Sequence, residues 1–427
     1  MLYPKHICLI GMLLGTFPQI TFAQNTLTLQ QAVKQAVSDS PYLAAQVKHI
    51  DALREVAPQV SSLPDPRLSV NALNLPINSF SNTQENMTQW QVGIRQDIPS
   101  LGKLSLKSDI ADQLADIAKY NTDEVRLKLI ERVKHRWWNI SYLDHALATV
   151  AKNQDLLRQL IRIAETKYKV GEGLQQDVLL AQLELSKLLD IEIQLTSSRK
   201  QEEARFNRLL HQPANQTIQL SQEVSETLPD MGLASDLFEQ ALQTRPILAR
   251  ETLRIATMEN RVLLAEEDYK PDFMVGAVYG LRSGSNPANG QHRADLLSVR
   301  VSMTLPWLTQ NKQDHQVEQR QAELAQAEFS YDDMKDMVLA DVSKSLTAYV
   351  QAKKQSSLYK TGIIPQAMQT VSSMLAAYQV NKVDFLNLVR AQITLYNYET
   401  QYWKVLAEAN QSQASLDAAI GRLESGI

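Results

Sequence analysis

Two long stretches of the chain keep a helical spacing of apolar side chains for nearly seventy residues each. They run from about 102 to 168 and from about 311 to 378, and each is followed by a second helical stretch, 174–210 or 385–420. In the first stretch, apolar positions step by threes, fours and a seven through Leu143, Leu147, Val150, Leu157, Leu160, Ala164 and Tyr168. This spacing is typical of a coiled-coil seam, and the length predicts rods of about 100 Å.

Four shorter stretches alternate apolar and polar residues, which predicts β-strands at about 67–77, 88–98, 272–281 and 295–305. One face of these strands is apolar, apart from Gln96, and the other carries Ser, Gln, Arg95, Asp97 and Arg300. Strands of this kind suit a membrane barrel with a water-filled lumen. The alternative is two soluble hairpins on a core, but the three charges would be costly in a packed interior.

Four strands are too few to close a membrane barrel, which needs about eight. We therefore expect three protomers to pool their strands into a barrel of twelve, wide enough to leave an aqueous pore. Trp90 at the outer end of one strand and Trp307 just past the inner end of another suit the two aromatic belts. The polar segments 79–87 and 282–293 would be loops outside the cell.

The two halves of the chain repeat each other. The segment from Tyr168 to Leu185 returns as the segment from Tyr378 to Leu395, an offset of 210 positions, while Pro41 is answered by Pro246 at an offset of 205. We interpret the chain as a tandem duplication, with a first repeat at 24–217, a linker at 218–234 and a second repeat at 235–427. The polar residues 211–232 are expected to be irregular and to girdle the rods.

Local signals predict where the helices begin, bend and end. Thr28 with Gln31 has the spacing of a capping box, and Ser40 before Pro41 predicts a helix that continues to about Val60. Pro365 should kink the second rod. Each repeat also has one tight turn between long helices, at Gly171 or Asn381, where a residue that tolerates positive φ is needed.

Residues 1–23 have the pattern of a secretory signal peptide, and Cys8 within it lacks the neighbours of a lipoprotein acylation site. Cys8 is the sole cysteine, so the mature chain would have no thiolate metal site. Removing the leader with Lys5 changes the net charge from −4 to −5, which disfavours a nucleic-acid partner. Met334 and Met337 beside three aspartates suit seam packing better than copper binding. We expect no cofactor, no metal site and no catalytic residues.

Taken together, these features resemble the TolC family of outer-membrane efflux ducts, over essentially the whole mature chain. The segments Leu63-Pro64-Asp65-Pro66, Pro99-Ser100-Leu101-Gly102-Lys103 and Ile364-Pro365-Gln366-Ala367 are most similar to the branch serving heavy-metal efflux, of the CusC and CzcC type. The resemblance implies a mainly α fold with a small transmembrane β part, and a trimer with a twelve-stranded barrel and an α-helical periplasmic tunnel. A periplasmic adaptor would dock on the tunnel and link it to an inner-membrane pump.

The resemblance also implies roles for single residues. The adaptor-docking tips would be Val170-Gly171-Glu172 and Val380-Asn381-Lys382. The family closes its tunnel with an aspartate that pairs with a tyrosine and an arginine, and the matching residues are Asp177, Tyr378 and Val383. A latch here would lack the ion pair and depend on a hydrogen bond from Tyr378 to Asp177.

The aspartate rings often found at the family's constriction are absent, because the matching positions are Asn387 and Arg390. Asp384, one turn nearer the tip, is a candidate for a substitute acid ring. The alternative is an acid placed at a helix N-terminus, where the macrodipole favours it.

The sequence therefore predicts a passive exit duct, not an enzyme, in the outer membrane of a Gram-negative cell. Heavy-metal cations handled by an RND-type pump are the expected cargo, with general drug efflux or type I secretion as the alternatives. A periplasmic coiled-coil scaffold is a more distant alternative, because it leaves the strands and their charges unexplained.

Overall fold

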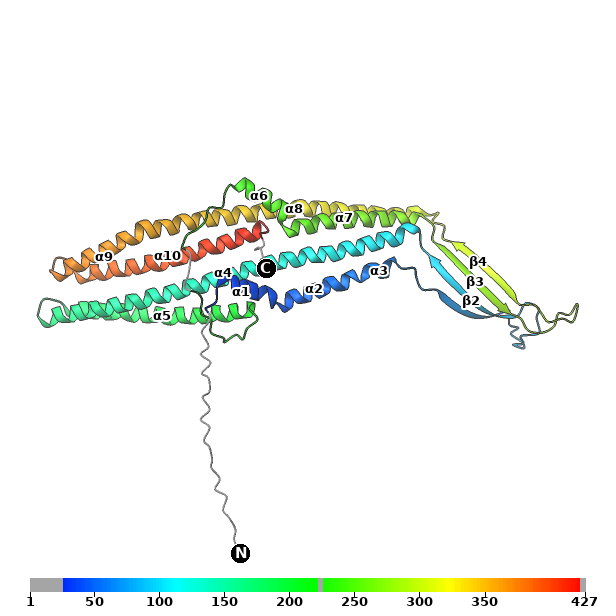
Figure 1. The fold of residues 1–427 in the computed structure, drawn as a ribbon, viewed down its shortest axis with the longest axis horizontal. Helices are drawn as coiled ribbons and strands as arrows, with labels where there is room; N and C mark the ends of the chain where they lie inside the picture. The colour runs from blue at the N-terminus through cyan, green and yellow to red at the C-terminus, as the bar shows by residue number, and fades with distance from the viewer. Residues whose placement is uncertain (1–25, 222–225, 423–427) are drawn as a thin grey trace, which may run out of the picture.

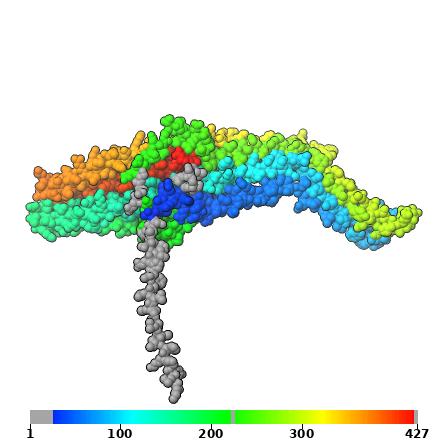
Figure 2. Space-filling view, in the orientation of Figure 1, coloured from blue at the N-terminus to red at the C-terminus, as the bar shows by residue number. Residues whose placement is uncertain are grey.

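The computed structural model describes residues 26–221 and 226–422 as one long molecule. Figure 1 shows a β-sheet at one end, two helical hairpin tips at the other, and short helices packed around the middle. The space-filling view shows the same narrow outline, bent where the helices meet the sheet (Figure 2). The predicted signal peptide lies outside the described residues. Within the described ranges, no helix is both long enough and apolar enough to cross a membrane.

The first repeat begins with three short helices, α1 (Leu29–Ser38), α2 (Pro41–Arg54) and α3 (Val56–Ser61). The predicted capping box is present: the Gln31 N–H donates to Thr28 Oγ1 over 3.3 Å, and the Thr28 N–H donates to Gln31 Oε1 over 3.0 Å. The prediction that one helix continues from Pro41 to about Val60 is wrong, because the chain forms two helices here. The chain breaks after Arg54 because the ring of Pro58 would clash with the carbonyl four residues earlier.

The four strands form a single antiparallel sheet in the order β1 (Arg67–Leu73), β2 (Gln89–Ile98), β3 (Phe273–Leu281) and β4 (Leu296–Met303). The first and second strands therefore come from one repeat and the third and fourth from the other. β1 is shorter than predicted, since it ends at Leu73 and the chain enters a left-handed conformation at Asn74, with φ 54°. β4 is also shorter, ending at Met303 instead of 305.

The first rod is the continuous helix α4 (Leu101–Lys169), which turns back into α5 (Gln175–Leu209). Five of the seven predicted seam residues are buried: Leu143, Val150, Leu157, Leu160 and Ala164. Leu147 is only partly buried, and Tyr168 was wrongly placed in the seam because its side chain is 48% exposed. The neighbouring Lys167, which is 9% exposed, occupies the inward position at this end of α4.

The second repeat begins with α6 (Ala234–Thr244) and α7 (Pro246–Glu266), followed by a short 3₁₀ turn, Glu267–Tyr269. After the sheet and a second 3₁₀ turn, Thr309–Asn311, the second rod runs through α8 (Gln313–Leu358) and α9 (Ile364–Gln379) and returns as α10 (Phe385–Ala419). The rod is interrupted at Tyr359–Ile363 by a π-helical turn. Pro365 explains the interruption, because it has no N–H to donate and its ring crowds the preceding turn.

The linker between the repeats crosses the middle of the molecule. Leu27 and Leu220 form an isolated parallel bridge, and Tyr349 Oη and Lys353 Nζ both donate to the Pro229 carbonyl. Lys360, within the π-helical turn, pairs with Glu226, which also accepts from Tyr402 Oη over 2.7 Å. The described part of this linker is thus held against α8, the π-helical turn and α10.

A polar cluster fixes the corner between sheet and helices. Lys103, near the start of α4, pairs with Asp268 at 2.9 Å and Asp272 at 3.0 Å, just before β3. The Ser100 N–H donates to Asp272 Oδ1 over 2.9 Å, and Ser100 Oγ donates to Glu267 over 2.7 Å. The end of β2 is therefore joined to the beginning of β3, which holds the sheet at a defined angle to the rods.

Candidate functional site

The two hairpin tips lie at the end of the molecule opposite to the sheet (Figure 1). Gly171 has φ 78° and Asn381 has φ 59°, so both take the predicted left-handed conformation. In each tip the next N–H donates back to a helix carbonyl, from Glu172 to Lys167 over 2.8 Å and from Lys382 to Ala377 over 2.9 Å. This is the Schellman arrangement, which lets a helix end and reverse within a few residues.

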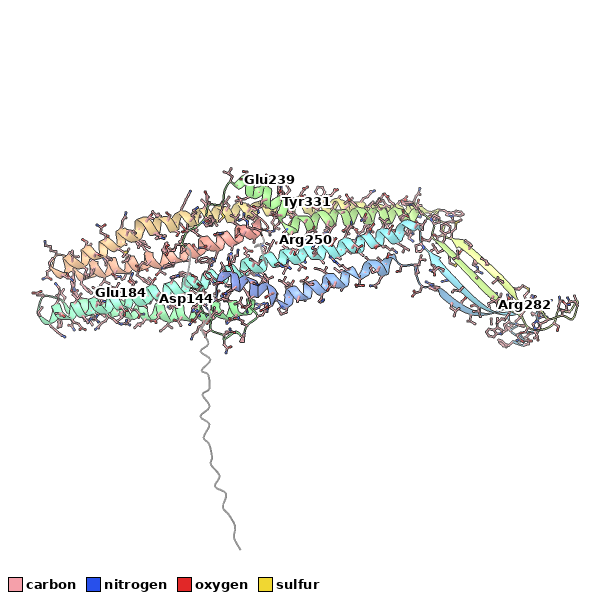
Figure 3. All side chains as sticks on the ribbon, in the orientation of Figure 1. Asp144, Glu184, Glu239, Arg250, Arg282 and Tyr331 are labelled. Carbon is pink, nitrogen blue, oxygen red and sulfur yellow. The ribbon has the colours of Figure 1, made fainter. Side chains whose placement is uncertain are left out.

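Both tips present an apolar side chain to solvent at the same position. Val170 is 64% exposed and Val380 is 62% exposed. The flanking residues Gly171, Glu172, Asn381 and Lys382 are exposed as well, so all the residues predicted for docking are accessible. Figure 3 labels Glu184 on α5 a short way behind the first tip.

Lys167 joins the two tips. Its Nζ donates to the Tyr378 carbonyl over 3.0 Å and also to Asn381 Oδ1, and it lies 4.9 Å from the centre of the Tyr378 ring. Sequence reasoning missed this residue. The signal available was an asymmetry between the repeats, since the position that answers Lys167 at the offset of 210 is the small residue Ala377.

The predicted hydrogen bond between Tyr378 and Asp177 is not formed in this chain. Tyr378 is 5% exposed, packs on Phe385 with ring centroids 5.2 Å apart, and its Oη has no hydrogen-bond partner among the described residues. Burial, followed by the charge of Asp177, raises the pKa of the Tyr378 hydroxyl. Burial raises the pKa of Asp177, a hydrogen bond with the Leu174 backbone partly opposes this, and the charge of Asp384 adds a smaller increase. The two groups interact through space but do not form the expected latch.

Asp384, Asn387 and Arg390 lie three residues apart on one exposed face of the beginning of α10, opposite the buried Phe385 and Leu388. Asp384 is the N-cap residue of α10 but makes no side-chain capping hydrogen bond. Its carboxylate therefore stays available at the helix N-terminus, where the helix macrodipole favours negative charge.

The sheet has two chemically different faces. One face carries large apolar side chains that are between 38% and 75% exposed: Leu68, Val70, Trp90, Val92, Ile94, Phe273, Val275, Tyr279, Leu281, Leu297, Val299, Val301 and Met303. The opposite face carries the residues predicted for a lumen, Arg95, Asp97 and Arg300, which alternate with them along the strands. Gln96, the polar residue on the apolar side, donates to the Pro64 carbonyl over 2.6 Å.

The predicted aromatic belt residues lie at opposite ends of this apolar face. Trp90 is the second residue of β2 and is 48% exposed, while Trp307 follows β4 on the helical side and is 76% exposed. The long connections beyond the outer ends of the strands carry Arg282, labelled in Figure 3. The apolar zone is thus bounded by one tryptophan toward the loops and one toward the helices.

A four-stranded sheet with an exposed apolar face, continued by two paired helical rods, defines an outer-membrane channel subunit. The outer membrane efflux protein family matches this chain over residues 32–211 and 237–422, and the chain belongs to that family. The two matched segments cover the two halves of the structure, and the predicted resemblance to the TolC family is confirmed.

Individual relatives are distant. The chain is 21% identical over 94% of its length to the cobalt-zinc-cadmium resistance protein CzcC of Cupriavidus metallidurans, covering 91% of that protein. It is 20% identical over 71% of its length to the toxin and drug export protein A of Aggregatibacter actinomycetemcomitans, covering 69% of that protein. Among solved structures, the outer-membrane channel OprN has a TM-score of 0.77 at 17% identity, with 92% and 90% of the two chains covered. CusC has a TM-score of 0.75 at 14% identity, with 92% of both chains covered.

Proposed function

We propose that this protein is the outer-membrane exit duct of a tripartite efflux system, and that three copies form the conducting pore. The observation that carries the proposal is the sheet, in which the outer strands β1 and β4 each have one edge that no described residue of the same chain pairs with. Unpaired edges seek further strands, and an apolar face this large is unstable in water. Pairing β4 of one copy with β1 of the next satisfies both edges, and three copies give a closed barrel of twelve strands.

The faces of the sheet assign inside and outside to such a barrel. Lipid would contact the apolar face between Trp90 and Trp307, and water would contact Arg95, Asp97 and Arg300. The helical rods then continue the pore as a tunnel in the periplasm. Their tips, with Val170 and Val380 exposed, would meet a periplasmic adaptor that connects the duct to an inner-membrane pump of the RND type. The exposed Asp384, Asn387 and Arg390 would line the gate region near these tips, with Asp177 close by and the buried Tyr378 packed behind them.

Heavy-metal cations are the proposed cargo. The relative CzcC is a cobalt-zinc-cadmium resistance protein and matches nearly the full length of this chain, which supports this choice. The similarity to a toxin and drug export protein favours general drug or polypeptide export as the second candidate. The duct itself would be passive, with the energy supplied by the pump.

Cell fractionation tests the duct, and deletion of the gene tests the cargo. We expect the protein in the outer-membrane fraction as a detergent-stable trimer, whereas a periplasmic scaffold would wash off with salt. Loss of the gene should raise sensitivity to zinc, cobalt, cadmium, copper or silver and raise cell-associated metal. Sensitivity to dyes and antibiotics with normal metal content would instead assign the protein to drug efflux.

A further inference from the structure

The strand register places three arginines in one row that crosses the sheet at right angles to the strands. We call each such row of paired residues a level. Arg67 is paired with Arg95, Arg95 with Gly276, and Gly276 with Arg300, so the row crosses all four strands. Residues directly opposite each other in antiparallel strands project to the same face. The three arginines therefore share the polar face, and all three are exposed.

Gly276 leaves a gap in this row between two of the arginines. A Cβ atom at position 276 would lie 3.1 Å from the Ile94 carbonyl oxygen and 3.3 Å from Arg95 Cβ. Since neighbouring strands are about 4.8 Å apart, the backbones of Arg95 and Arg300 are separated by about 10 Å. Two extended arginine side chains can reach across that distance toward a shared ligand above the glycine.

The positive charge of the row is only partly balanced. Among residues 26–221 and 226–422, Arg95 and Arg300 make no hydrogen bond or ion pair, and Arg67 makes one long contact of 3.9 Å with Asp97. Asp97 lies one level nearer the helices, beside Met274 and Ser302. Asp65, two residues before Arg67 and outside the strand, is exposed, and Asp272 is already paired with Lys103. Among the paired strand residues of these two levels, each chain thus contributes three guanidinium groups and one carboxylate.

We propose that Arg95 and Arg300 bind oxyanions above Gly276, and that this level makes the lumen prefer anions over cations. The proposal rests on the trimeric duct proposed above, in which three copies bring nine such arginines to the wall of the lumen. Guanidinium groups bind sulfate, phosphate and carboxylate through paired N–H donors, and a wall of one charge raises the local concentration of counter-ions. A free divalent cation meets like charge here, so cationic cargo would cross this level accompanied by anions.

Ion selectivity of the purified full-length trimer tests the site. The wild type, Arg95→Gln, Arg300→Gln and the double variant would be inserted in neutral phosphatidylcholine bilayers, which hold no anionic lipid. Reversal potentials in a KCl gradient give the ratio of chloride to potassium permeability, and added sulfate reports on binding. Lys344→Gln, which removes an exposed charge from α8 far from the sheet, is the matched control.

We expect a preference for chloride at about 0.1 M salt that falls about sixteen-fold with each arginine removed. One unit charge at about 5 Å in water raises the local concentration of chloride about four-fold and lowers that of potassium about four-fold. The preference should fade near 1 M salt, where the screening length is about 3 Å. Sulfate should reduce the current of the wild type and of Lys344→Gln, but not of the double variant. Arg300→Lys should keep the preference for chloride while weakening the block by sulfate, because it keeps the charge and loses the guanidinium fork.

Two results overturn the inference in different ways. A conducting wild type with the same selectivity as the double variant removes the arginine site and leaves the duct intact. A folded trimer that conducts no ions, with its tips opened by substitution, removes the duct and the inference with it. Heat-stable trimers on gels show for each variant that a change in current does not come from loss of assembly.

Discussion

Lys167 makes polar contacts between the two tips, where the resemblance to the TolC family implied a hydrogen bond from Tyr378 to Asp177. Its ammonium group is nearly enclosed, yet its donors reach the Tyr378 carbonyl and Asn381 Oδ1 of the other repeat. The second contact also explains why Asn is useful at a turn where Gly would fit. An asparagine in the left-handed conformation supplies an acceptor that glycine lacks.

Replacing Lys167 with methionine should loosen the contact between the two tips. The variant keeps the apolar stem but loses hydrogen bonds from a charged donor, each worth about 2 kcal/mol. Hydrogen exchange at the amides from Asn381 to Leu388 should become faster, and the pore should conduct more at rest. Lys169→Met, at an exposed position two residues away, is the control and should change neither. Equal exchange in both variants would show that Lys167 does not hold the tips.

Asp177 should make the packing of the tips depend on pH. Burial and the nearby charge of Asp384 raise its pKa above the ordinary value of 3.8, so the folded chain binds the proton more readily than the unfolded chain. Stability must then fall as pH rises from 3.8 through the raised pKa, and recover when the solution is acidified. Asp177→Asn should be more stable than the wild type at pH 7 and lose this pH dependence. Thermal unfolding between pH 3 and 7 measures it, and a variant that keeps the wild-type slope would contradict the assignment.

At the scale of elements, the π-helical turn and the linker form one unit. The turn brings Lys360 onto the side of the rod where Glu226 also accepts a hydrogen bond from Tyr402 on α10. Hydrogen bonds from Lys360 and then Tyr402 lower the pKa of Glu226. A lowered carboxyl pKa contributes stability that is present above the unfolded value and lost as pH falls through the folded value.

Glu226→Gln should therefore lower the melting temperature at pH 7 and have a smaller effect at an acidic pH, where a larger share of the wild-type carboxylate is protonated too. The expected change is a few degrees, because Glu226 and Lys360 are partly exposed and water screens their attraction. Glu239→Gln on α6 is a suitable control, since Glu239 is labelled on the outer side of the molecule in Figure 3. A loss of the same size at both pH values would mean that the ion pair is not responsible.

At the scale of the whole molecule, successive residues of a strand project to opposite faces of the sheet, one apolar and one polar. Val70 lies in the middle of β1 on the apolar face and is 63% exposed, and Asn71 projects to the polar face. In the proposed barrel, Val70→Arg would place a charge against lipid, at a cost of about 2 to 4 kcal/mol per copy near the bilayer midplane. Asn71→Arg would place the same charge in the proposed lumen, at little cost.

We expect Val70→Arg to reduce the yield of assembled trimer in the outer membrane and Asn71→Arg to leave it near the wild-type level. The amount of heat-stable trimer in purified outer membranes measures both. If the two variants assembled equally well, the apolar face would not be facing lipid, and the twelve-stranded barrel would lose its support.

Much of the architecture could be read from the chain because its signals are local. The alternation of the strands, the seventy-residue helical spacing, the two caps at Thr28 and Ser40 and the left-handed turns at Gly171 and Asn381 depend on neighbours within a few residues. The tight turn between long helices occurs twice, at an offset of about 210 positions. This repetition makes the prediction of a helical hairpin stronger than either turn alone. The break between α2 and α3 is harder to predict, because Pro58 lies inside a pattern that stays helical on both sides of it.

The sequence by itself determined the four strands, the long rods, the turns between them and the membership of an outer-membrane family, because side-chain periodicity and backbone preference act along the chain. Only the tertiary structure decided which residues meet across the repeats. Lys167 reaches Asn381 across 214 positions, Glu226 joins Lys360 and Tyr402, and the strand register aligns Arg67, Arg95 and Arg300. Such contacts depend on how two elements are shifted against each other, and a shift of one residue would change every partner.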